Sequence, residues 1–523
     1  MTICKIDDIL SSGTTIFLKP ELEGDHTMKK STDMSIATIR FLRAKICRLM
    51  AVFIVVLLLN LSISKPEAIA GDDFSDYTLD KVVVLMRHGV RPQNDTAKLD
   101  QATGKKWSQW LVPDGNLSGH GYAGIVDQSR YMFENWKSEG LALSSPCPKK
   151  NEVFIWASPI ERTVATAQAL TDGMFPGCGI TPSHLPLQKK DPLFQSVEMG
   201  LARPDPKKVD NEVMEAMGGS PEKAAQKYAD DVALLRQTVC GKKPKDCQFL
   251  DEQWGFKKTK SGKYKLTGPV SSASAISETI RLQYSEGLPL HDVAFGHVKN
   301  AGDVLKLMSL HAAKYDLLDN TMEIARTGGN ILMHEITDSL IAGSVAENEE
   351  SYPELGSPLV IFVGHDTNIS QIKTILDFHW KLASYPADDI PPGGMLIFKR
   401  YKNNKTGRLA VQLSFAARTL DEWRFLTPLS EKNPIAREIY TNPECSLSGK
   451  DETGRMDEKG DKTPEKAKGV KAPEKQESAK TPQKNESANS GASDLGTLCD
   501  LETFVSLYRD KLDDIPDDLP LFK

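Results

Sequence analysis

The sequence predicts an α/β fold: a central, mostly parallel sheet with helices on both faces, plus an inserted, mostly α-helical cap domain. Three short apolar runs carry this prediction, at residues 82–86, 153–158 and 358–363. Runs that are apolar at almost every position are typical of strands buried on both faces, as in parallel sheets. Polar residues follow each run directly, and ligands bind at the carboxyl ends of parallel strands.

The first run ends in Arg87-His88-Gly89-Val90-Arg91. Neighbouring guanidinium groups disfavour the charged form of a histidine, so this imidazole should stay neutral and able to act as a nucleophile. Guanidinium groups also match the oxygens of a phosphate group with paired hydrogen bonds. Taken alone, the motif is equally consistent with a strand end that carries solvated basic residues.

The third run ends in Gly364-His365-Asp366, so a second histidine and a carboxylate follow a buried strand. The carboxylate can serve as a proton donor and acceptor in catalysis. An alternative role for Asp366 is the N-cap of the next helix, and the two roles are compatible.

The middle run passes into a helical segment whose first turn carries Arg162. With the other two strand ends, this arginine completes a set of cations, a nucleophile and a proton donor that suits phosphoryl transfer. The alternative is a solvated helix arginine that pairs with Glu161.

These motifs together resemble the histidine acid phosphatase family. Residues 161–168 and 175–178 are similar to its bacterial periplasmic glucose-1-phosphatases. Other segments are similar to its bacterial periplasmic phytases: residues 191–194, 268–274, 364–368 and 391–394. The similarity runs from about residue 82 to the C-terminus, apart from one insertion.

The resemblance implies a phosphomonoesterase in which His88 attacks phosphorus to form a phosphohistidine and Asp366 protonates the leaving oxygen. It implies that four residues hold the phosphate oxygens: Arg87, Arg91, Arg162 and His365. No metal or organic cofactor is expected, because the arginines already supply positive charge. The other histidines, His311 among them, match no family role and are expected on the surface or in the core.

The expected substrate is a small phosphate monoester, namely phytate with some sugar phosphates, hydrolysed at acid pH. The alternatives are a glucose-1-phosphatase, a broad-specificity acid phosphatase, or a phosphate-binding protein without catalysis. Phytate carries six phosphates, and Lys98 could help to bind them. One departure from the family pattern is Pro92, which directly follows Arg91 and leaves Gln93 where the family has proline. Because proline restricts the preceding residue, the loop should turn differently here.

Residues 1–70 form an N-terminal leader with a signal peptide predicted at about 40–70. Basic residues precede an apolar stretch at 50–59, and Ala68-Ile69-Ala70 resembles a cleavage site. The sequence therefore predicts a periplasmic or secreted protein without stable membrane association after cleavage. A membrane anchor is the alternative, but a transmembrane helix needs about twenty apolar residues.

Six cysteines follow this leader, and an even number in an exported chain indicates disulfides. Proximity in the chain and the family resemblance favour three pairs: Cys147–Cys178, Cys240–Cys247 and Cys445–Cys499. A zinc site is the alternative, but the cysteines lack the spacing of a zinc ligand set.

The mature chain is predicted to divide into five segments. Residues 71–184 and 351–448 form the α/β domain, with a hairpin at 394–399 and 409–415, and 494–523 form its C-terminal segment. Residues 185–350 form the cap, in which Ile276, Ile280 and Tyr284 share one helix face and Ser271 and Ser272 are possible caps. Residues 449–493 are polar and expected to be disordered.

The net charge of −6, with no basic face interleaved with aromatic residues, argues against nucleic-acid binding. No feature of the sequence indicates an oligomeric state.

Overall fold

The computed structural model describes residues 74–344, 352–442, 444–445, 447, 495–515 and 519–522. The predicted leader and signal peptide, and the predicted insertion at 449–493, lie outside the described residues. Within the described part of the chain, no helix is long and apolar enough to cross a membrane.

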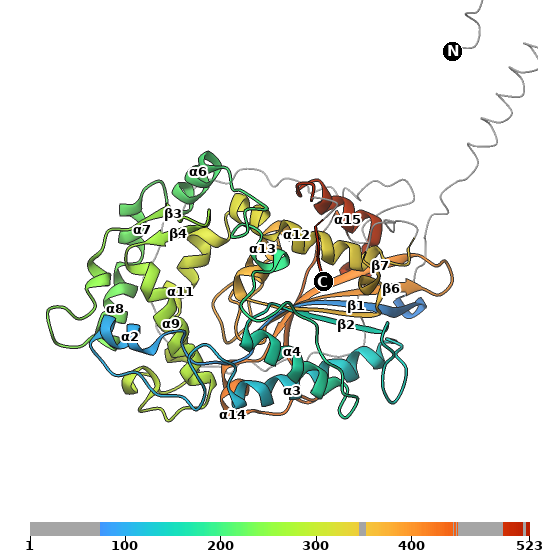
Figure 1. The fold of residues 1–523 in the computed structure, drawn as a ribbon, viewed down its shortest axis with the longest axis horizontal. Helices are drawn as coiled ribbons and strands as arrows, with labels where there is room; N and C mark the ends of the chain where they lie inside the picture. Colours follow the sequence, from blue (N-terminus) through green and yellow to red (C-terminus); the bar gives the residue numbers. More distant parts are fainter. Residues whose placement is uncertain are drawn as a thin grey trace, which may run out of the picture. The chain divides into compact units, whose positions relative to one another are not determined.

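A mixed sheet forms the centre of the fold (Figure 1). Its main path runs, in spatial order, through β2 (Val153–Ala157), β5 (Leu359–Gly364), β1 (Tyr77–Arg87), β6 (Met395–Asn403), β7 (Leu409–Ala417) and β8 (Ala436–Ile439). The short strand β9 (Cys499–Asp500) pairs with β7. The three predicted strands β2, β5 and β1 are parallel, and the other strands add antiparallel pairs. The predicted hairpin is β6–β7, and β6 is longer than expected.

The register of the parallel strands brings their carboxyl ends to one edge of the sheet. Arg87 lies opposite Gly364, and Ala157 lies opposite Val363. The polar residues that follow the three strands therefore start from neighbouring positions, although they are far apart in the sequence.

Helices cover both faces of the sheet (Figure 1). One face packs on α3 (Gly119–Ser138) and α4 (Glu161–Met174), and the other on α12 (Met322–Ile341), α13 (Asp366–Leu376) and α15 (Leu501–Arg509). Alternate residues of β1 enter different hydrophobic cores: Val83 and Leu85 lie in one, and Val84 and Met86 in the other. A strand buried on both sides needs apolar residues at successive positions, which explains the continuous run.

The region between β2 and β5 is mostly helical, as predicted. Besides α4 and α12, which pack on the sheet, its α-helices are α5 (Pro192–Gln195), α6 (Pro206–Ala216), α7 (Pro221–Lys227), α8 (Ala229–Val239), α9 (Pro269–Ser285), α10 (Ala301–Lys306) and α11 (Ser309–Lys314). Two further short helices elsewhere in the chain are α2 (Thr96–Thr103) and α14 (Leu420–Phe425). A two-stranded hairpin that the sequence analysis did not anticipate, β3 (Gly255–Lys258) and β4 (Tyr264–Thr267), lies among the cap helices.

Helix α9 carries its predicted apolar face, because Ile276, Ile280 and Tyr284 are buried. The predicted caps of this helix are wrong. Gly268 is the N-cap and Pro269 is the first helical residue, a position where proline's fixed φ angle and missing N–H are tolerated. The two serines at 271–272 lie in the first turn and line a cleft instead.

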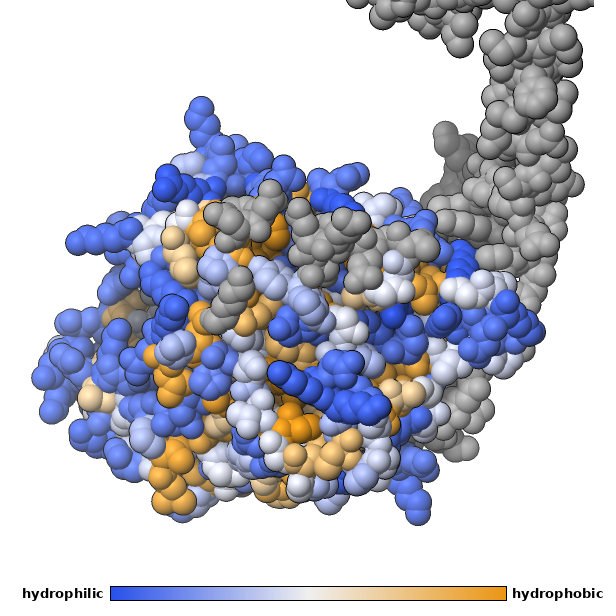
Figure 2. Space-filling view, turned by 45° about the vertical axis from the view of Figure 1, so that its right-hand side comes forward, coloured by the Kyte–Doolittle hydropathy of each residue, from blue (hydrophilic) through white to orange (hydrophobic). Residues whose placement is uncertain are grey.

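The three predicted disulfides are present. Their Cα–Cα distances are 5.6 Å for Cys147–Cys178, 5.8 Å for Cys240–Cys247 and 4.6 Å for Cys445–Cys499. The last bond ties β9 to the segment after β8. Over the face turned forward in Figure 2, hydrophilic side chains predominate and apolar ones are scattered among them.

Candidate active site

His88 directly follows β1, and the backbone of two other segments holds it in place. Its N–H donates to the Gly364 carbonyl (3.2 Å), and its own carbonyl accepts from the Gly393 N–H (3.0 Å). Nδ1 of the ring lies 2.9 Å from the Gly89 carbonyl oxygen. Because a carbonyl can only accept, Nδ1 carries the proton, and the lone pair on Nε2 is left for attack.

Two close backbone approaches around His88 require glycine. Gly393 has a φ of +67°, and a Cβ there would lie 2.8 Å from a ring carbon of Trp423. A Cβ on Gly121, in the first turn of α3, would lie 2.3 Å from the carbonyl oxygen of Val90. The loop that carries His88 is therefore packed against the backbone of α3 on one side, and Gly393, whose N–H binds the His88 carbonyl, is packed against the ring of Trp423.

The imidazole of His88 is 2 % exposed. Burial, followed by the charges of Arg162, Arg91 and Arg87, lowers its pKa well below the usual value. The ring is therefore neutral in acid solution, as the sequence motif predicted.

Arg87 is buried beneath His88. Its guanidinium donates to Glu278 and to the carbonyl oxygen of Ile390, and it lies 3.4 Å from Oδ2 of Asp366. Burial alone would lower the pKa of Arg87, but the carboxylates of Glu278 and Asp366 raise it. This arginine is a fixed cation, oriented from three sides.

Arg91 and Arg162 supply two more cations. Arg91 Nη1 donates to the backbone carbonyl oxygen of Pro92 (2.7 Å), which orients this side chain. Burial and the nearby Arg162 lower the pKa of Arg91 to about 10, which still leaves it charged in acid and at neutral pH. Glu161 accepts a hydrogen bond from the Leu117 N–H (2.8 Å), whereas Nη1 of Arg162 lies 3.5 Å from the carbonyl of Gly115.

His365 is the N-cap residue of α13, and Nε2 of its ring lies 3.1 Å from the hydroxyl of Ser158 at the end of β2. Burial and then Arg162 lower the pKa of His365 to about 3, so this ring is also neutral. Its centroid lies 5.7 Å from that of His88, edge to face.

Asp366 is the first residue of α13 rather than its N-cap. Its Oδ1 accepts from the Thr367 N–H (2.9 Å), while Oδ2 faces Arg87. The side chain is 23 % exposed. Burial would raise the pKa of this carboxyl, but Arg87 and Lys314 hold it well below the usual value. The free protein therefore carries Asp366 as a carboxylate.

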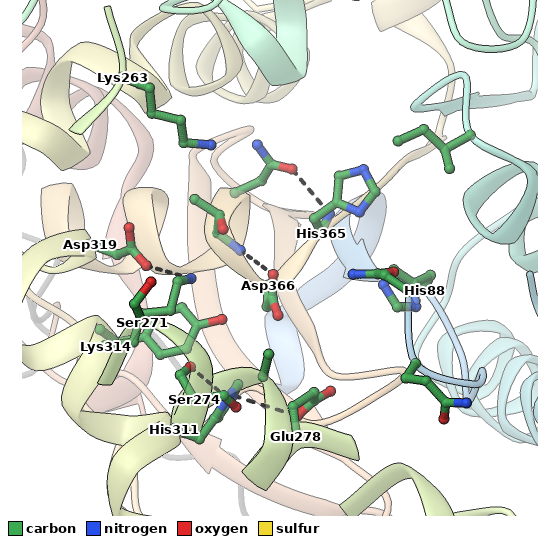
Figure 3. Close-up of a pocket in the computed structure, with 18 of the residues that line it drawn as sticks. His88, Lys263, Ser271, Ser274, Glu278, His311, Lys314, Asp319, His365 and Asp366 are labelled. Atoms are coloured by element: carbon green, nitrogen blue, oxygen red, sulfur yellow. Dashed lines mark hydrogen bonds and ion pairs between the residues drawn. The ribbon is translucent and has the colours of Figure 1, made fainter. Parts of the chain in front are cut away.

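These residues share one cleft of about 610 Å³ between the sheet edge and the cap. Its lining includes five of the six predicted phosphate-site residues: His88, Arg91, Arg162, His365 and Asp366. Arg87, the sixth, is not among the lining residues, but its guanidinium lies 3.4 Å from Asp366. In Figure 3 His88 and His365 lie on one side of Asp366, and Lys314 and Asp319 lie on the other.

The cap contributes lining residues that the sequence analysis missed. Four of them lie close to the catalytic groups: Glu278, His311, Lys314 and Tyr315. The expectation for His311 was incomplete: it is buried, but it also lines the cleft and lies 3.6 Å from Glu278. No strand-end motif marks these residues, because helices α9 and α11 and the turn that follows α11 bring them to the cleft.

Among the described residues, no group of three or more His, Cys, Asp or Glu side chains is arranged to hold a metal ion. The arrangement instead places the neutral imidazoles of His88 and His365, the cations of Arg91 and Arg162 and the carboxylate of Asp366 around a space that can hold an anion. Such a set can bind a tetrahedral phosphate and stabilise negative charge that develops on it.

Comparisons with known proteins agree with this geometry. Residues 78–416 match the model of the histidine phosphatase superfamily (branch 2). Phytase AppA of Escherichia coli (strain K12) is 29 % identical over 393 residues, covering 73 % of this chain and 90 % of the relative. Glucose-1-phosphatase of Providencia rettgeri is 27 % identical over 386 residues, with 73 % and 90 % covered.

Solved structures are similar over a still larger share of the chain. The phytase of Klebsiella sp. ASR1 has 29 % sequence identity and a TM-score of 0.69, covering 85 % of this chain and 98 % of that one. The phytase of Citrobacter braakii has 28 % identity and a TM-score of 0.67, with 83 % and 98 % covered. Together with the fold and the cleft, the family match leads to one conclusion: this chain belongs to branch 2 of the histidine phosphatase superfamily.

Proposed function

We propose that this protein is an acid phosphomonoesterase that works through a phosphohistidine on His88, and that its main substrate is phytate. In the first step, Nε2 of His88 attacks phosphorus, and the bond between phosphorus and the ester oxygen breaks. The leaving oxygen takes a proton from Asp366 and departs as an alcohol.

In the second step a water molecule attacks the phosphorus of the phosphohistidine. Asp366, now a carboxylate, accepts the proton of that water, the P–N bond breaks, and phosphate leaves. Throughout both steps Arg87, Arg91 and Arg162 neutralise the non-bridging oxygens, with the neutral ring of His365 as a further donor.

The substrate supplies the proton on Asp366. Arg87 and Lys314 keep the free carboxyl ionised. A phosphate monoester has a second pKa of about 6, so in acid it binds as a monoanion that still carries one proton. An anion beside Arg87 also offsets the charge that lowers the pKa of Asp366, which favours transfer of that proton to the carboxylate.

The observation that favours phytate is a set of three lysines around the cleft, beyond the arginines of the phosphate cradle: Lys98, Lys263 and Lys314. A substrate with several phosphates needs cations at a distance from the scissile one. A monophosphate such as glucose 1-phosphate presents a neutral sugar to the same walls. A phosphate-binding cleft for monophosphates has no need of these lysines.

The cap lysines are each held by one acid. Nζ of Lys314 lies 2.7 Å from Asp319, and Nζ of Lys263 lies 2.9 Å from Glu198. In Figure 3 Lys263 and Lys314 both lie on the cap side of Asp366, across from His88. The hydroxyl of Tyr315, which is buried and has no hydrogen-bond partner among the described residues, lines the same cleft and offers another donor.

The test is kcat/KM on phytate, glucose 1-phosphate and p-nitrophenyl phosphate at about pH 4.5, because ratios of kcat/KM report differential binding of transition states. We expect phytate to be preferred over glucose 1-phosphate. A preference for glucose 1-phosphate of more than about tenfold would contradict the phytate assignment and leave the phosphatase mechanism intact.

Lysine variants refine this test. Lys314→Gln and Lys263→Gln should lower kcat/KM on phytate more than on p-nitrophenyl phosphate, which has no second phosphate. Lys265→Gln is the matched control, because Lys265 is exposed in the same hairpin and is not among the residues that line the cleft. Equal losses on both substrates would show that these lysines do not bind further phosphates.

A further inference from the structure

Arg281 is a completely buried arginine that the proposed mechanism does not use. It lies on α9, one turn beyond Glu278. A buried charge is unfavourable unless it is paired and hydrogen-bonded. Arg281 has two acidic partners: Nη2 contacts Oε2 of Glu278, and Nη1 lies 2.5 Å from Oδ2 of Asp389.

These contacts form a closed network next to Arg87, one of the arginines proposed to bind phosphate. Arg87 contacts Oε1 of Glu278 and donates to the carbonyl of Ile390, the residue that follows Asp389. The two arginines therefore connect the same two parts of the chain, helix α9 and the segment 389–390. Each arginine uses a different oxygen of Glu278.

Because each oxygen of Glu278 contacts a different arginine, Arg281 limits how much of this carboxylate Arg87 can contact. While Arg281 holds Oε2, Glu278 presents one oxygen to Nη2 of Arg87, which also faces Asp366, and Nη1 of Arg87 donates to the carbonyl of Ile390. Without Arg281, both carboxylate oxygens of Glu278 could turn to Arg87 in a fork-to-fork pair. Arg87 would then be more fully neutralised and drawn toward α9, away from the phosphate.

We propose that Arg281 and Asp389 are positioning residues: through Glu278 they set the orientation and the available charge of Arg87. This inference rests on the proposed phosphate-binding role of Arg87 and does not depend on which phosphate monoester is the substrate. Neither residue is among those that line the cleft.

The experiment is the inhibition constant of inorganic phosphate in the double variant Arg281→Met/Asp389→Leu. The double variant removes the Arg281–Asp389 pair as a whole, which is often neutral for stability, and leaves Glu278 paired with Arg87, so this variant should fold. Asp389→Asn, which keeps the shape of the side chain, is a second variant. The inhibition constant is informative because it does not depend on the fraction of enzyme that is folded.

We expect the double variant to bind phosphate more weakly and to lose about 10- to 100-fold in kcat/KM on p-nitrophenyl phosphate, as is typical when the partners that orient a functional group are lost. Arg281→Lys, which keeps the charge, should recover part of the loss. Arg400→Met is the control, because Arg400 is also a buried arginine paired with an aspartate, Asp80, but lies near the opposite end of β1. It should lower the melting temperature and leave the inhibition constant unchanged.

A folded double variant or Asp389→Asn with a wild-type inhibition constant would overturn the inference. Arg87→Met separates this outcome from a failure of the proposed function. If Arg87→Met also binds phosphate normally, the role of Arg87 is wrong. If it weakens binding while the Arg281 and Asp389 variants do not, only the positioning inference is wrong.

Discussion

The proposed nucleophile, His88, has no substitute among the cleft histidines. His365 is bound to Ser158, and His311 contacts Ser274 and Glu278. We therefore expect His88→Ala to abolish turnover while the fold persists. Wild-type enzyme quenched in acid during turnover should retain phosphate in an acid-labile linkage, detectable with labelled substrate, and the variant should not. Normal turnover by the variant would rule out a phosphohistidine.

The proton donor can be identified from how the reaction rate depends on the leaving group. Asp366→Asn removes a group whose assistance is typically worth about 10²–10⁴-fold in rate. The loss should be large for phytate and alkyl phosphates and small for p-nitrophenyl phosphate, whose leaving group needs little protonation. Equal losses on both kinds of substrate would assign the donor to another residue.

The neutral histidines predict an unusual pH dependence. A histidine with a lowered pKa stays neutral until the pH falls through that lowered value, which is about 3 for His365 and well below the usual value for His88. The profile of kcat/KM, which reports groups of the free enzyme, should therefore show no acid limb near pH 6.5 and fall only toward pH 3. A loss of kcat/KM with a midpoint of about 6 on the acid side would contradict the neutral state of His88 and His365.

At the scale of elements, the loop before β6 acts on the site through its backbone. Gly393→Ala would place a Cβ against Trp423 at a positive φ, so we expect a loss of about 1–3 kcal/mol in the free energy of unfolding and a lower kcat. Gly407→Ala is the control: it has a φ of +77° but open space around it. It should lose only the smaller backbone contribution and keep full activity, as measured by urea unfolding and steady-state kinetics.

Elements whose sequence pattern is local were predictable. The strand ends at Arg87 and Gly364 and the hairpin β6–β7 follow from short segments in which apolar runs meet polar residues, whereas the catalytic roles of the residues after those strands are proposals. The segment 391–394 resembles the family in sequence, but only the structure explains why it has a glycine at 393. The N–H of Gly393 donates to the carbonyl of His88.

The cap was less predictable for a physical reason. Lys314 and Glu278 reach the cleft because their helices fold back over the sheet edge, and no local pattern encodes that orientation. The hairpin β3–β4 has only four residues in each strand, too short for a clear alternation. The pairing of Arg281 with Asp389 joins positions 108 residues apart, which a single sequence cannot reveal.

For the whole molecule, the histidines that the fold holds neutral should make the free energy of unfolding depend on pH. The pKa of His88, His365 and His311 is lowered in the folded state, so between these values and about 6.5 the unfolded chain binds more protons. Their contribution to stability is present above about pH 6.5 and is lost as the pH falls toward 3.

We therefore expect these three histidines to lower the free energy of unfolding in urea as the pH falls from about 7 to 4, since each unit of pKa shift corresponds to about 1.4 kcal/mol. Glu286 and Glu335, whose pKa is raised by burial to about 7 and 8, act in the opposite direction, so the histidine contribution is read from the difference between wild type and a histidine variant. His365→Asn should make this dependence shallower. His297→Gln, at an exposed position, is the control and should leave it unchanged. An unaltered pH dependence in His365→Asn would show that the ring is not held neutral by the fold.

The place of β1 in the sheet also constrains how the protein folds. This strand directly precedes His88, the proposed nucleophile, and lies between β5 and β6. The residues that pair with it come later in the chain, by about 277 positions for Leu359 and by more for Met395. Contacts between distant positions require closure of a long loop before they stabilise anything, and a high contact order slows folding. Strand β1 therefore stays unpaired until β5 has been synthesised, and its other edge stays open until β6 has been synthesised. Any protein that binds the emerging chain has the whole of that interval in which to act.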